Sequence, residues 1–456
     1  MQSENYLKSI LQISDNQSSN FQDFIKETNA LQITEEIISK FEYLKEIWKI
    51  KEKKGDIERQ HITIPNAKIG KQYQAKLDFN ELHWEDFFWF EIIGLESFGL
   101  HFNNQTHHIT GVPNDSGEAS FQIKFKLHEA DEVNSKKINF YINPDPKTLF
   151  KNNPSDTSDE FWKEDNKNFC KKIEDKSLII SSKRGRSHAH NDGFREDDFL
   201  YNEIQDTQWH LICISDGAGS AKFSRKGSAL VVEKTNTYFK QQSSVESLKK
   251  IDNLIDNLSE NVDEIHEISQ NFLLECAAFV HDEIKEFAIS KNSTIKDFHA
   301  TQAFVLVKKH QKGYAILSFG IGDCPINVLY DESDKVILLN DLDIGEYSGG
   351  TWFVTSEEIF KNRYTIKNRA KFSFFNDFQY LFLMTDGIYD PKFSVENQLN
   401  NIQKWKDLLV DLQGENEDKV KVDFSLPIED TLNKLDQWMD FWSPGNHDDR
   451  TVAIIY

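Results

Sequence analysis

The stretch LICISDGAGS at residues 211–220 joins an apolar run to an Asp-Gly pair, and LFLMTDG at residues 381–387 repeats this arrangement. A third apolar run, AILSFGIGD at residues 315–323, ends in Gly-Asp, and Asp448–Asp449 stands just before the closing run TVAIIY. Apolar runs of this length are typical of buried strands, and a glycine beside the aspartate allows a sharp turn close to a ligand. The pattern therefore predicts carboxylates at the mouths of four strands that lie far apart in sequence.

Carboxylates that gather at one edge of a sheet predict a metal site. Like charges in such a place repel one another unless a cation lies between them. Hard divalent cations such as Mg²⁺ and Mn²⁺ prefer an environment made only of oxygen atoms. The chain is therefore expected to be an enzyme that holds metal ions with carboxylates.

Length and charge exclude several classes of protein. At 456 residues the chain has room for two or three domains. Its 53 basic and 75 acidic residues give a net charge of −22, which argues against a nucleic-acid binder and against anionic membrane surfaces. No apolar stretch approaches a membrane span, and the first residues lack the pattern of a signal peptide. None of the four cysteines forms a CxxC pair, so free thiols and a cytoplasmic location are expected.

Four segments differ in their residue patterns. Residues 1–58 are expected to form a helical segment that packs on a neighbour through apolar residues at helical spacing: Ile37, Ile38, Phe41, Leu44 and Trp48. Residues 60–147 show the short alternating runs of a small all-β sandwich, and residues 148–176 form a polar linker. Residues 177–456 alternate blocks of antiparallel strands with helix pairs, which favours an α+β layered sandwich over a parallel sheet.

The all-β segment resembles a known bacterial family. IPNAKIGKQYQAKL (residues 64–77) and FGLHFNNQTHHITGVPNDSGEASFQIKF (residues 98–125) are similar to the immunoglobulin-like or cadherin-like bacterial repeat. The resemblance implies a binding or spacer module without catalytic residues. The adjacent pair His107–His108 is either a metal-ligand pair or, more commonly, a polar feature of a strand edge.

An acidic group precedes the first Asp-Gly pair. HNDGFREDDF, residues 190–199, offers Glu196, Asp197 and Asp198 in succession. Such a run is usually a solvated loop, but its place one hairpin before ISDGAGS favours a metal ligand.

The ordered set of motifs from residue 178 to residue 456 resembles the metal-dependent Ser/Thr protein phosphatases of type 2C, the PPM family. The family's motifs are an acidic pair, D-G-x-G-G, G-D, T/S-D-G and D-N/D-x-T. Here they correspond in order to Glu196–Asp197, D-G-A-G-S at 216–220, Gly322–Asp323, T-D-G at 385–387 and D-D-R-T at 448–451. Ser187–His188 and GEYSGGTWFVT (residues 345–355) are similar to features of a bacterial branch.

The resemblance implies a fold and a set of metal ligands. The implied fold is a four-layer α-β-β-α sandwich. Asp216 would bridge two ions with help from the Gly217 carbonyl, while Asp386 and Asp448 would hold one of them. Asp197, with Glu196 nearby, would lie on the other side, directly or through waters, and Asp323 matches an acid that supports a third ion in some members. The E-D-D run can slip by one residue, which leaves Asp198 as an alternative to Asp197.

The implied activity is hydrolysis of phosphoserine and phosphothreonine in proteins. A binuclear Mg²⁺ or Mn²⁺ site would activate a water, with Asp216, Asp197, Asp386 and Asp448 as the catalytic carboxylates. The implied partners are phosphoprotein substrates and a Ser/Thr kinase or its targets. Two alternatives share these motifs: a catalytically weak phosphoprotein-binding scaffold, and a metal phosphoesterase acting on small molecules.

Two positions depart from the family pattern. Asp192 stands where many members have a phosphate-gripping arginine, so Arg186 or Arg195 is expected to bind phosphate instead. Ala218 stands where members from higher organisms have a histidine that serves as a candidate general acid. His188 or His190 can fill that role, although a structural hydrogen bond is the more common function of such a histidine.

Overall fold

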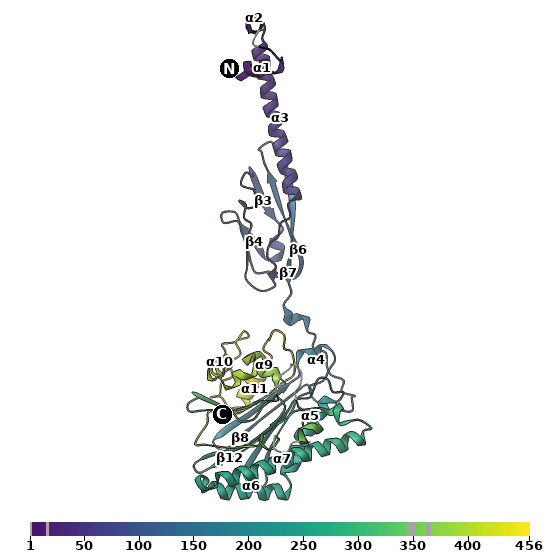
Figure 1. Cartoon of the computed structure of the whole chain (residues 1–456), viewed down its shortest axis with the longest axis vertical. Coiled ribbons are helices and arrows are strands. Elements are labelled where there is room, and N and C mark those ends of the chain that lie inside the picture. The colour runs from purple at the N-terminus through teal and green to yellow at the C-terminus, as the bar shows by residue number, and fades with distance from the viewer. Residues whose placement is uncertain (1, 15–17, 344–351, 362–365) are drawn as a thin grey trace. The chain divides into compact units, whose positions relative to one another are not determined.

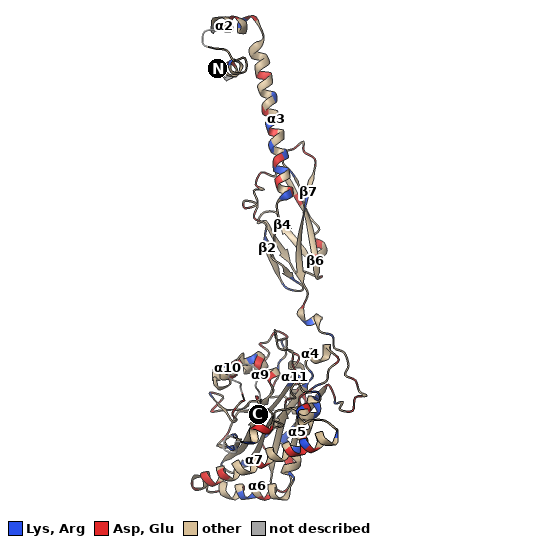
Figure 2. Ribbon diagram, turned by 45° about the vertical axis from the view of Figure 1, so that its right-hand side comes forward, with Lys and Arg blue, Asp and Glu red and all other residues tan. Residues whose placement is uncertain are grey.

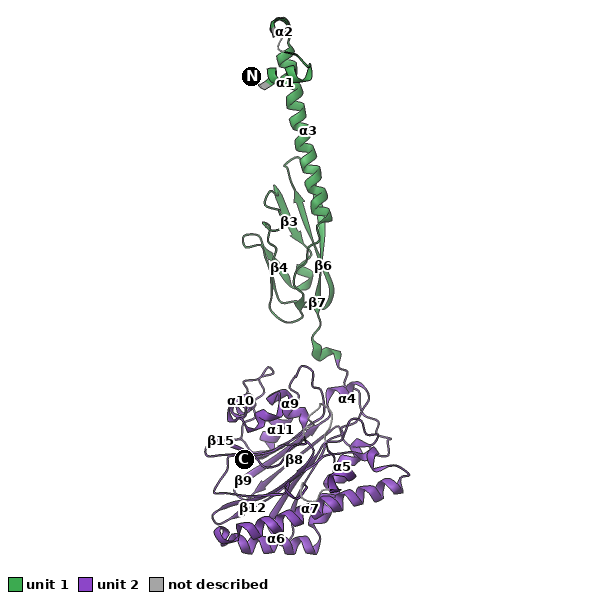
Figure 3. Ribbon diagram, viewed as in Figure 1, with its two compact units in different colours: residues 1–149 green, residues 150–456 purple. Residues whose placement is uncertain are grey.

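The computed structural model describes the whole chain except residues 1, 15–17, 344–351 and 362–365. The chain divides into two compact units, residues 1–149 and residues 150–456, which are described here one at a time (Figure 3). In the part of the chain that the structure describes, no helix combines the length and the apolar character needed to cross a membrane.

The first unit begins with three helices, α1 (Gln2–Ile10), α2 (Ser18–Glu27) and α3 (Ala30–Arg59). α1 and α2 pack against the beginning of α3, where Ala30 and Thr34 are buried. The predicted helix is therefore present, but its apolar face does not pack as expected. Ile37, Phe41, Leu44 and Trp48 remain between 41% and 64% exposed.

A β-sandwich follows α3 in the same unit (Figure 1). One sheet has the order β1-β7-β6-β3 and the other the order β2-β5-β4. Their bounds are β1 (Ala67–Lys68), β2 (Tyr73–Lys76), β3 (Trp89–Ile93), β4 (Leu100–Asn103), β5 (His108–Gly111), β6 (Gly117–Lys126) and β7 (Asn134–Asn143). Alternate residues of β6 and β7 fill the core, as the period-two pattern predicts. The likeness to the immunoglobulin-like repeat stays a prediction.

The histidine pair of the sandwich is not part of a metal cluster. His107 stacks on Phe79 with ring centroids 4.1 Å apart, and the Nδ1 atom of His108 lies 2.8 Å from the Thr106 carbonyl oxygen. Neither histidine belongs to a group of metal-binding side chains among the described residues. These contacts fit the strand-edge interpretation, which is the more common one for such a pair.

The second unit contains two antiparallel sheets. The first, β10-β11-β12-β13-β16, has the strands β10 (Asp198–Ile204), β11 (Trp209–Ser215), β12 (Gln302–His310), β13 (Gly313–Ile321) and β16 (Lys371–Phe375). The second, β15-β14-β17-β18-β9-β8, has the strands β8 (Asn166–Ile173), β9 (Lys176–Lys183), β14 (Ile326–Tyr330), β15 (Lys335–Leu338), β17 (Tyr380–Met384) and β18 (Arg450–Ile455).

Strand alternation explains how both faces of these sheets are buried. In β11, Ile212 points into the core between the two sheets, whereas its neighbour Leu211 points into a core shared with helices. Those helices are α5 (Ser224–Phe239), α6 (Gln242–Ile255) and α7 (Leu258–Ser290). The outer face of the second sheet packs on α9 (Asp386–Phe393), α10 (Ile402–Leu412) and α11 (Ile428–Trp438) (Figure 1). The helix and strand content is mixed, as predicted.

The boundary of the second unit differs from the predicted one. The segment expected to be a linker at residues 148–176 contains β8, which pairs with β9 at the edge of the second sheet. Before β8, Phe161 packs on Phe223 and Phe298 of the first helical layer. The polar composition of this segment concealed both contacts, because its few apolar residues are widely spaced.

The two sheets also make polar contacts at the end where β13 begins. Tyr314 Oη donates a hydrogen bond to Asp175, in the turn between β8 and β9. Lys309 of β12 forms an ion pair with the same carboxylate at 2.6 Å. The opposite end of the sandwich, where β11 and β13 finish, carries the carboxylates described next.

Candidate active site

Four strand ends bring four aspartates to one cavity. Asp216 follows β11 and Asp323 follows β13 in the first sheet, whereas Asp386 follows β17 and Asp448 precedes β18 in the second. Together they line a cavity of about 280 Å³, with Thr301, Phe353 and the Gly217–Ser220 backbone completing its wall. Carboxylate atoms of Asp216 and Asp323 lie within 4.8 Å of each other. The cavity thus joins residues that are far apart in sequence.

Local geometry explains why glycines accompany these aspartates. Gly322 has a φ of +106°, a value that residues other than glycine rarely adopt. This backbone conformation turns the chain out of β13 just before Asp323. A Cβ atom on Gly387 would lie 1.8 Å from the Asp449 carbonyl oxygen, so only glycine allows α9 to pass β18 this closely. The Asp216 backbone N–H donates to Thr301 Oγ1 at 2.8 Å, which fixes the turn after β11.

The acidic run before β10 splits between two environments. Asp197 Oδ2 accepts hydrogen bonds from the hydroxyls of Thr385 and Thr451 at 2.8 and 2.7 Å, beside the second sheet's aspartates. Asp198, the next residue, instead forms ion pairs with Lys163 and Lys167. Successive side chains of a strand point to opposite faces, so only one of the two aspartates can face the cavity side.

The carboxylates of the cavity destabilise one another. Burial and then the charge of Asp386 raise the pKa of Asp216 well above its usual value, and burial and Asp448 do the same for Asp386. Burial raises the pKa of Glu196 to about 7, and burial with the nearby charge of Asp449 raises that of Asp197 to about 7. Such a group is unfavourable in its charged form unless a cation compensates it.

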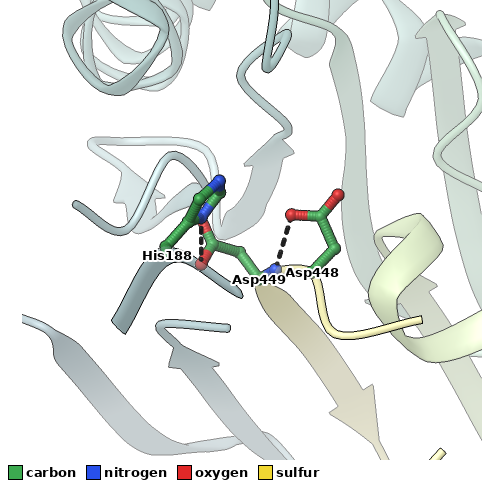
Figure 4. A group of neighbouring side chains, drawn as sticks. All are labelled: His188, Asp448 and Asp449. Carbon is green, nitrogen blue, oxygen red and sulfur yellow. Dashed lines mark hydrogen bonds and ion pairs between the residues drawn. The ribbon is translucent and has the colours of Figure 1, made fainter. Parts of the chain in front are cut away.

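Beside the cavity, His188 and Asp449 form an ion pair (Figure 4). His188 belongs to the short helix α4 (Arg186–His190), and its Nδ1 atom lies 3.0 Å from Asp449 Oδ1. Although burial opposes it, the charge and contact of Asp449 raise the pKa of His188 to about 10. Asp449 also accepts hydrogen bonds from the backbone N–H groups of Gly185 and Glu196, both at 2.5 Å.

A partly buried lysine supports the acidic run from the other side. Lys163 Nζ donates to the carbonyl oxygen of Asp197 at 2.7 Å and lies 3.3 Å from the Asp198 carboxylate. Burial lowers the pKa of Lys163 to about 8. Lys163 therefore connects the segment before β8 to the backbone that carries the cavity-facing residues.

The two arginines expected to bind phosphate are engaged elsewhere. Arg195 is only 1% exposed, and its guanidinium donates to Ser182 Oγ and to the carbonyl oxygens of Glu164 and Asp197. Arg186 donates to the carbonyl oxygens of Asp440 and Phe441. Neither lines the cavity among the described residues. Both arginines hold backbone segments together in this structure, and phosphate binding by either of them stays a prediction.

The donor atoms of the cavity fit a hard divalent cation. The four aspartates offer only oxygen, and the nearby Glu196 Oε2 atom is buried without a hydrogen-bond partner among the described residues. Cys324 lies next to Asp216 and Asp323, but burial raises the pKa of its thiol well above the usual value. The four carboxylates are the ligands that hard cations such as Mg²⁺ and Mn²⁺ prefer.

Sequence reasoning missed several residues around the cavity. It assigned no role to Asp449, although the residue stands next to Asp448, and it placed Lys163 in a linker. Thr385 and Thr451 stand in the T-D-G and D-D-R-T motifs but were given no role, and Thr301 carried no signal because a threonine at a strand end is common. The segment 345–355, similar to a bacterial branch, falls largely outside the described residues.

Comparison with known families identifies one family whose sequence model matches this chain. A sequence model described as "Protein phosphatase 2C" matches residues 184–433, more than half of the chain. The chain belongs to the protein phosphatase 2C family. Members of this family are metal-dependent phosphatases, typically with Mg²⁺ or Mn²⁺. No curated protein matches the sequence.

Solved structures with similarity to this phosphatase 2C family member include bacterial phosphatases. A "bacterial serine phosphatase" is 18% identical with a TM-score of 0.37, and covers 61% of this chain and 96% of its own. Serine/threonine phosphatase Stp1 from Staphylococcus aureus is 14% identical with a TM-score of 0.36, covering 64% and 98%. RsbX in complex with magnesium is 13% identical with a TM-score of 0.32, covering 63% and 98%. The family assignment and the residues of the cavity therefore carry the functional conclusion.

Proposed function

We propose that this protein is a phosphoserine/phosphothreonine protein phosphatase that acts with two Mg²⁺ or Mn²⁺ ions, with Asp323 available for a third. The observation that carries the proposal is the convergence of Asp216, Asp323, Asp386 and Asp448 on one cavity from both sheets. Bound cations would offset the charge of a phosphate and make a water more acidic.

The chain's own residues have distinct parts in this proposal. Asp216 would be the ligand shared by two ions, and Asp386 and Asp448, which line the same cavity from the second sheet, would complete the set. Asp197, with Glu196 beside it, would hold the second ion directly or through waters, and the hydroxyls of Thr385 and Thr451 fix its carboxylate. These hydroxyl donors keep the Asp197 carboxylate in one rotamer. A water that donates a hydrogen bond to this carboxylate would therefore be held in one orientation.

Backbone amides offer a place for phosphate oxygens, since no arginine lines the cavity among the described residues. Gly219 and Ser220 line the cavity, and their N–H groups have no acceptor within the part of the chain that the structure describes. Amides on such a turn can donate to an anion. This arrangement supplies two donors where Asp192 leaves the family's usual arginine position without a cation.

The proposed substrates are phosphoproteins, namely a Ser/Thr kinase or the targets of such a kinase. The test is hydrolysis of a phosphothreonine peptide with Mn²⁺, with Mg²⁺ and with EDTA. We expect activity with either metal and none with the chelator, while thiol alkylation leaves it unchanged because the buried cysteines are not used. Activity that persists in excess EDTA would contradict the proposal.

Two further outcomes would favour other functions. Hydrolysis of small phosphate esters but not of phosphopeptides would indicate a small-molecule phosphoesterase. Metal-dependent binding of a phosphopeptide without turnover would indicate the catalytically weak scaffold.

A further inference from the structure

The segment from Asn340 to Asp343, which we call the bracket, contacts the backbone on both sides of Asp323. The Asn340 Nδ2 atom donates a hydrogen bond to the Cys324 carbonyl oxygen at 2.9 Å. Asp343 Oδ2 accepts a hydrogen bond from the Gly322 N–H at 2.8 Å, and the Asp343 N–H donates to the Gly322 carbonyl oxygen at 2.9 Å. The residues directly before and after Asp323 are therefore both bound by the bracket.

An ion pair fixes the second end of the bracket. Arg369 donates to both carboxylate oxygens of Asp343, at 2.7 and 2.5 Å, and to the Gly320 carbonyl oxygen at 3.3 Å. Acidic and basic residues are common on the helices of this unit, as Figure 2 shows for α5, α6 and α7. Asp343 and Arg369, in contrast, are each only 8% exposed. Two parallel hydrogen bonds between a guanidinium and a carboxylate hold the carboxylate in one orientation.

The turn before Asp323 is also confined from the side of Asp216. A Cβ atom on Gly322 would lie 2.5 Å from Thr301 Cγ2, so Gly322 packs directly on this threonine. The Oγ1 atom of Thr301 accepts the hydrogen bond from the Asp216 N–H. Gly322 therefore lies between Asp343 and the threonine that fixes the turn of Asp216.

The buried ion pair is better explained by its position than by stability. A buried pair is often no more stabilising than apolar residues of the same size, because both charges lose their hydration. Asp323 lines the cavity together with three other aspartates, whose charges repel its own. A carboxylate in such a place stays there only if its backbone is firmly held, and the bracket supplies this support.

We propose that the bracket and Arg369 position Asp323 and thereby set how tightly this carboxylate holds a metal ion. The inference rests on the proposed function and extends it to residues outside the cavity. Asn340, Asp343 and Arg369 do not line the cavity in the part of the chain that the structure describes. They act through the backbone on either side of Asp323.

Isothermal titration of the full chain with Mn²⁺ tests the proposal. Asp323→Ala identifies the ion that Asp323 holds, as the site that this variant loses. Asp343→Asn keeps an oxygen for the Gly322 N–H but removes the ion pair, and Arg369→Lys keeps the charge but not the two parallel hydrogen bonds. We expect each of these two variants to weaken the same Mn²⁺ site by about tenfold, and to leave the other Mn²⁺ sites within about twofold of the wild type.

A double-mutant comparison separates positioning from general destabilisation. In an Asp323→Ala background the carboxylate that the bracket positions is absent. Adding Arg369→Lys to this background should therefore leave Mn²⁺ binding unchanged. Equal weakening of Mn²⁺ binding with and without the Asp323 carboxylate would overturn the proposal. Arg369→Lys preserves the charge of the pair, so this comparison stands even where Asp343→Asn fails to fold by circular dichroism.

Asp252→Asn is the matched control, because it breaks an ion pair of the second unit at the end remote from the cavity. Asp252 of α6 pairs at 2.8 Å with Lys308 of β12, which lies opposite Ala315 near the start of β13. We expect this variant to unfold at a lower temperature and to bind Mn²⁺ as the wild type does.

Two outcomes distinguish failure of this inference from failure of the proposed function. A wild type that neither binds Mn²⁺ nor hydrolyses a phosphopeptide would overturn both. An active wild type whose Mn²⁺ affinities are unchanged in Asp343→Asn and in Arg369→Lys would overturn the positioning role alone.

Discussion

The imidazole of His188 lies 3.0 Å from the carboxylate of Asp449, the residue that directly follows the proposed ligand Asp448 (Figure 4). Asp449 also accepts backbone hydrogen bonds from Gly185 and Glu196. One buried carboxylate thus ties α4, the acidic run and the start of β18 to a common point. The position of Asp448 depends on this point, because its neighbour in the chain is held from three sides.

Replacing His188 by Ala should weaken metal binding as well as the fold. The Asp449 carboxylate, only 2% exposed, would lose its charged partner, and we expect unfolding to become easier by about 2–3 kcal/mol. Loss of a residue that positions a ligand typically reduces metal affinity by about 10–100-fold. Isothermal titration with Mn²⁺ measures the affinity. His190→Ala, an exposed position on the same helix, is the control and should retain wild-type affinity.

Asp216→Asn and Asp198→Asn should have opposite effects on stability. Asp216→Asn should reduce activity by at least about a hundredfold. In chelator it should be no less stable than the wild type, because it removes a repelling carboxylate. Asp198→Asn leaves Lys163 without its anionic partner and should cost on the order of 3 kcal/mol. Thermal unfolding in EDTA distinguishes the two, and equal destabilisation would show that Asp216 is not in a repulsive cluster.

The stability of the metal-free protein should rise as the pH falls from 8 to 6. Burial raises the pKa of Glu196 and Asp197 to about 7, whereas in the unfolded chain both ionise near pH 4. Between these values the folded state binds more protons than the unfolded state, so lowering the pH favours folding. We expect a gain of about 1–3 kcal/mol over this range. Denaturant unfolding in EDTA measures it, and Asp197→Asn should show a smaller gain.

The strand-end carboxylates could be predicted from sequence because each is a local signal. An apolar run followed by Asp-Gly specifies both the strand and its turn, as at Asp216 and Asp386. The choice between Asp197 and Asp198 could not be predicted, since it depends on the register of β10 against β11. Lys163 reaches Asp198 across 35 residues, and nothing within its polar segment indicates that contact.

The contacts that Arg186 and Arg195 make could not be predicted, for a similar reason. A buried guanidinium that binds carbonyl oxygens, as Arg195 does, and one that binds a substrate have the same sequence signature. Only the packing of Glu164 and Ser182 around Arg195 separates them.

Arg186→Ala should leave phosphate recognition nearly unchanged. Its guanidinium is held by the carbonyl oxygens of Asp440 and Phe441, away from the cavity lining. We expect KM for a phosphopeptide and inhibition by free phosphate to stay within about threefold of wild type, where loss of a true bidentate contact would cost much more. Steady-state kinetics decides, and a tenfold rise in KM would return Arg186 to the phosphate site.

Fragments should show where the catalytic unit begins. A fragment starting at Phe150 is expected to fold and to retain activity on small phosphate esters, since all the contacts of the second unit are then kept. One starting at Ser177 loses β8 and Lys163 and exposes the edge of β9. We expect this shorter fragment to be unstable or inactive. Comparable activity from both would show that Lys163 is dispensable.

The two ends of the catalytic sandwich are fastened by different means. Where β13 begins, Tyr314 and Lys309 both contact Asp175 and join the sheets through protein side chains alone. Where β13 ends, the sheets meet through carboxylates that repel. Removal of the metal ions by a chelator should therefore separate the sheets only at the cavity end, because the contacts of Asp175 still hold the opposite end together. Backbone hydrogen exchange in EDTA should then be faster around Asp216 and Asp386, while the amides near Tyr314 stay protected. The metal concentration would thus control the opening of the cavity end without affecting the opposite end of the sandwich.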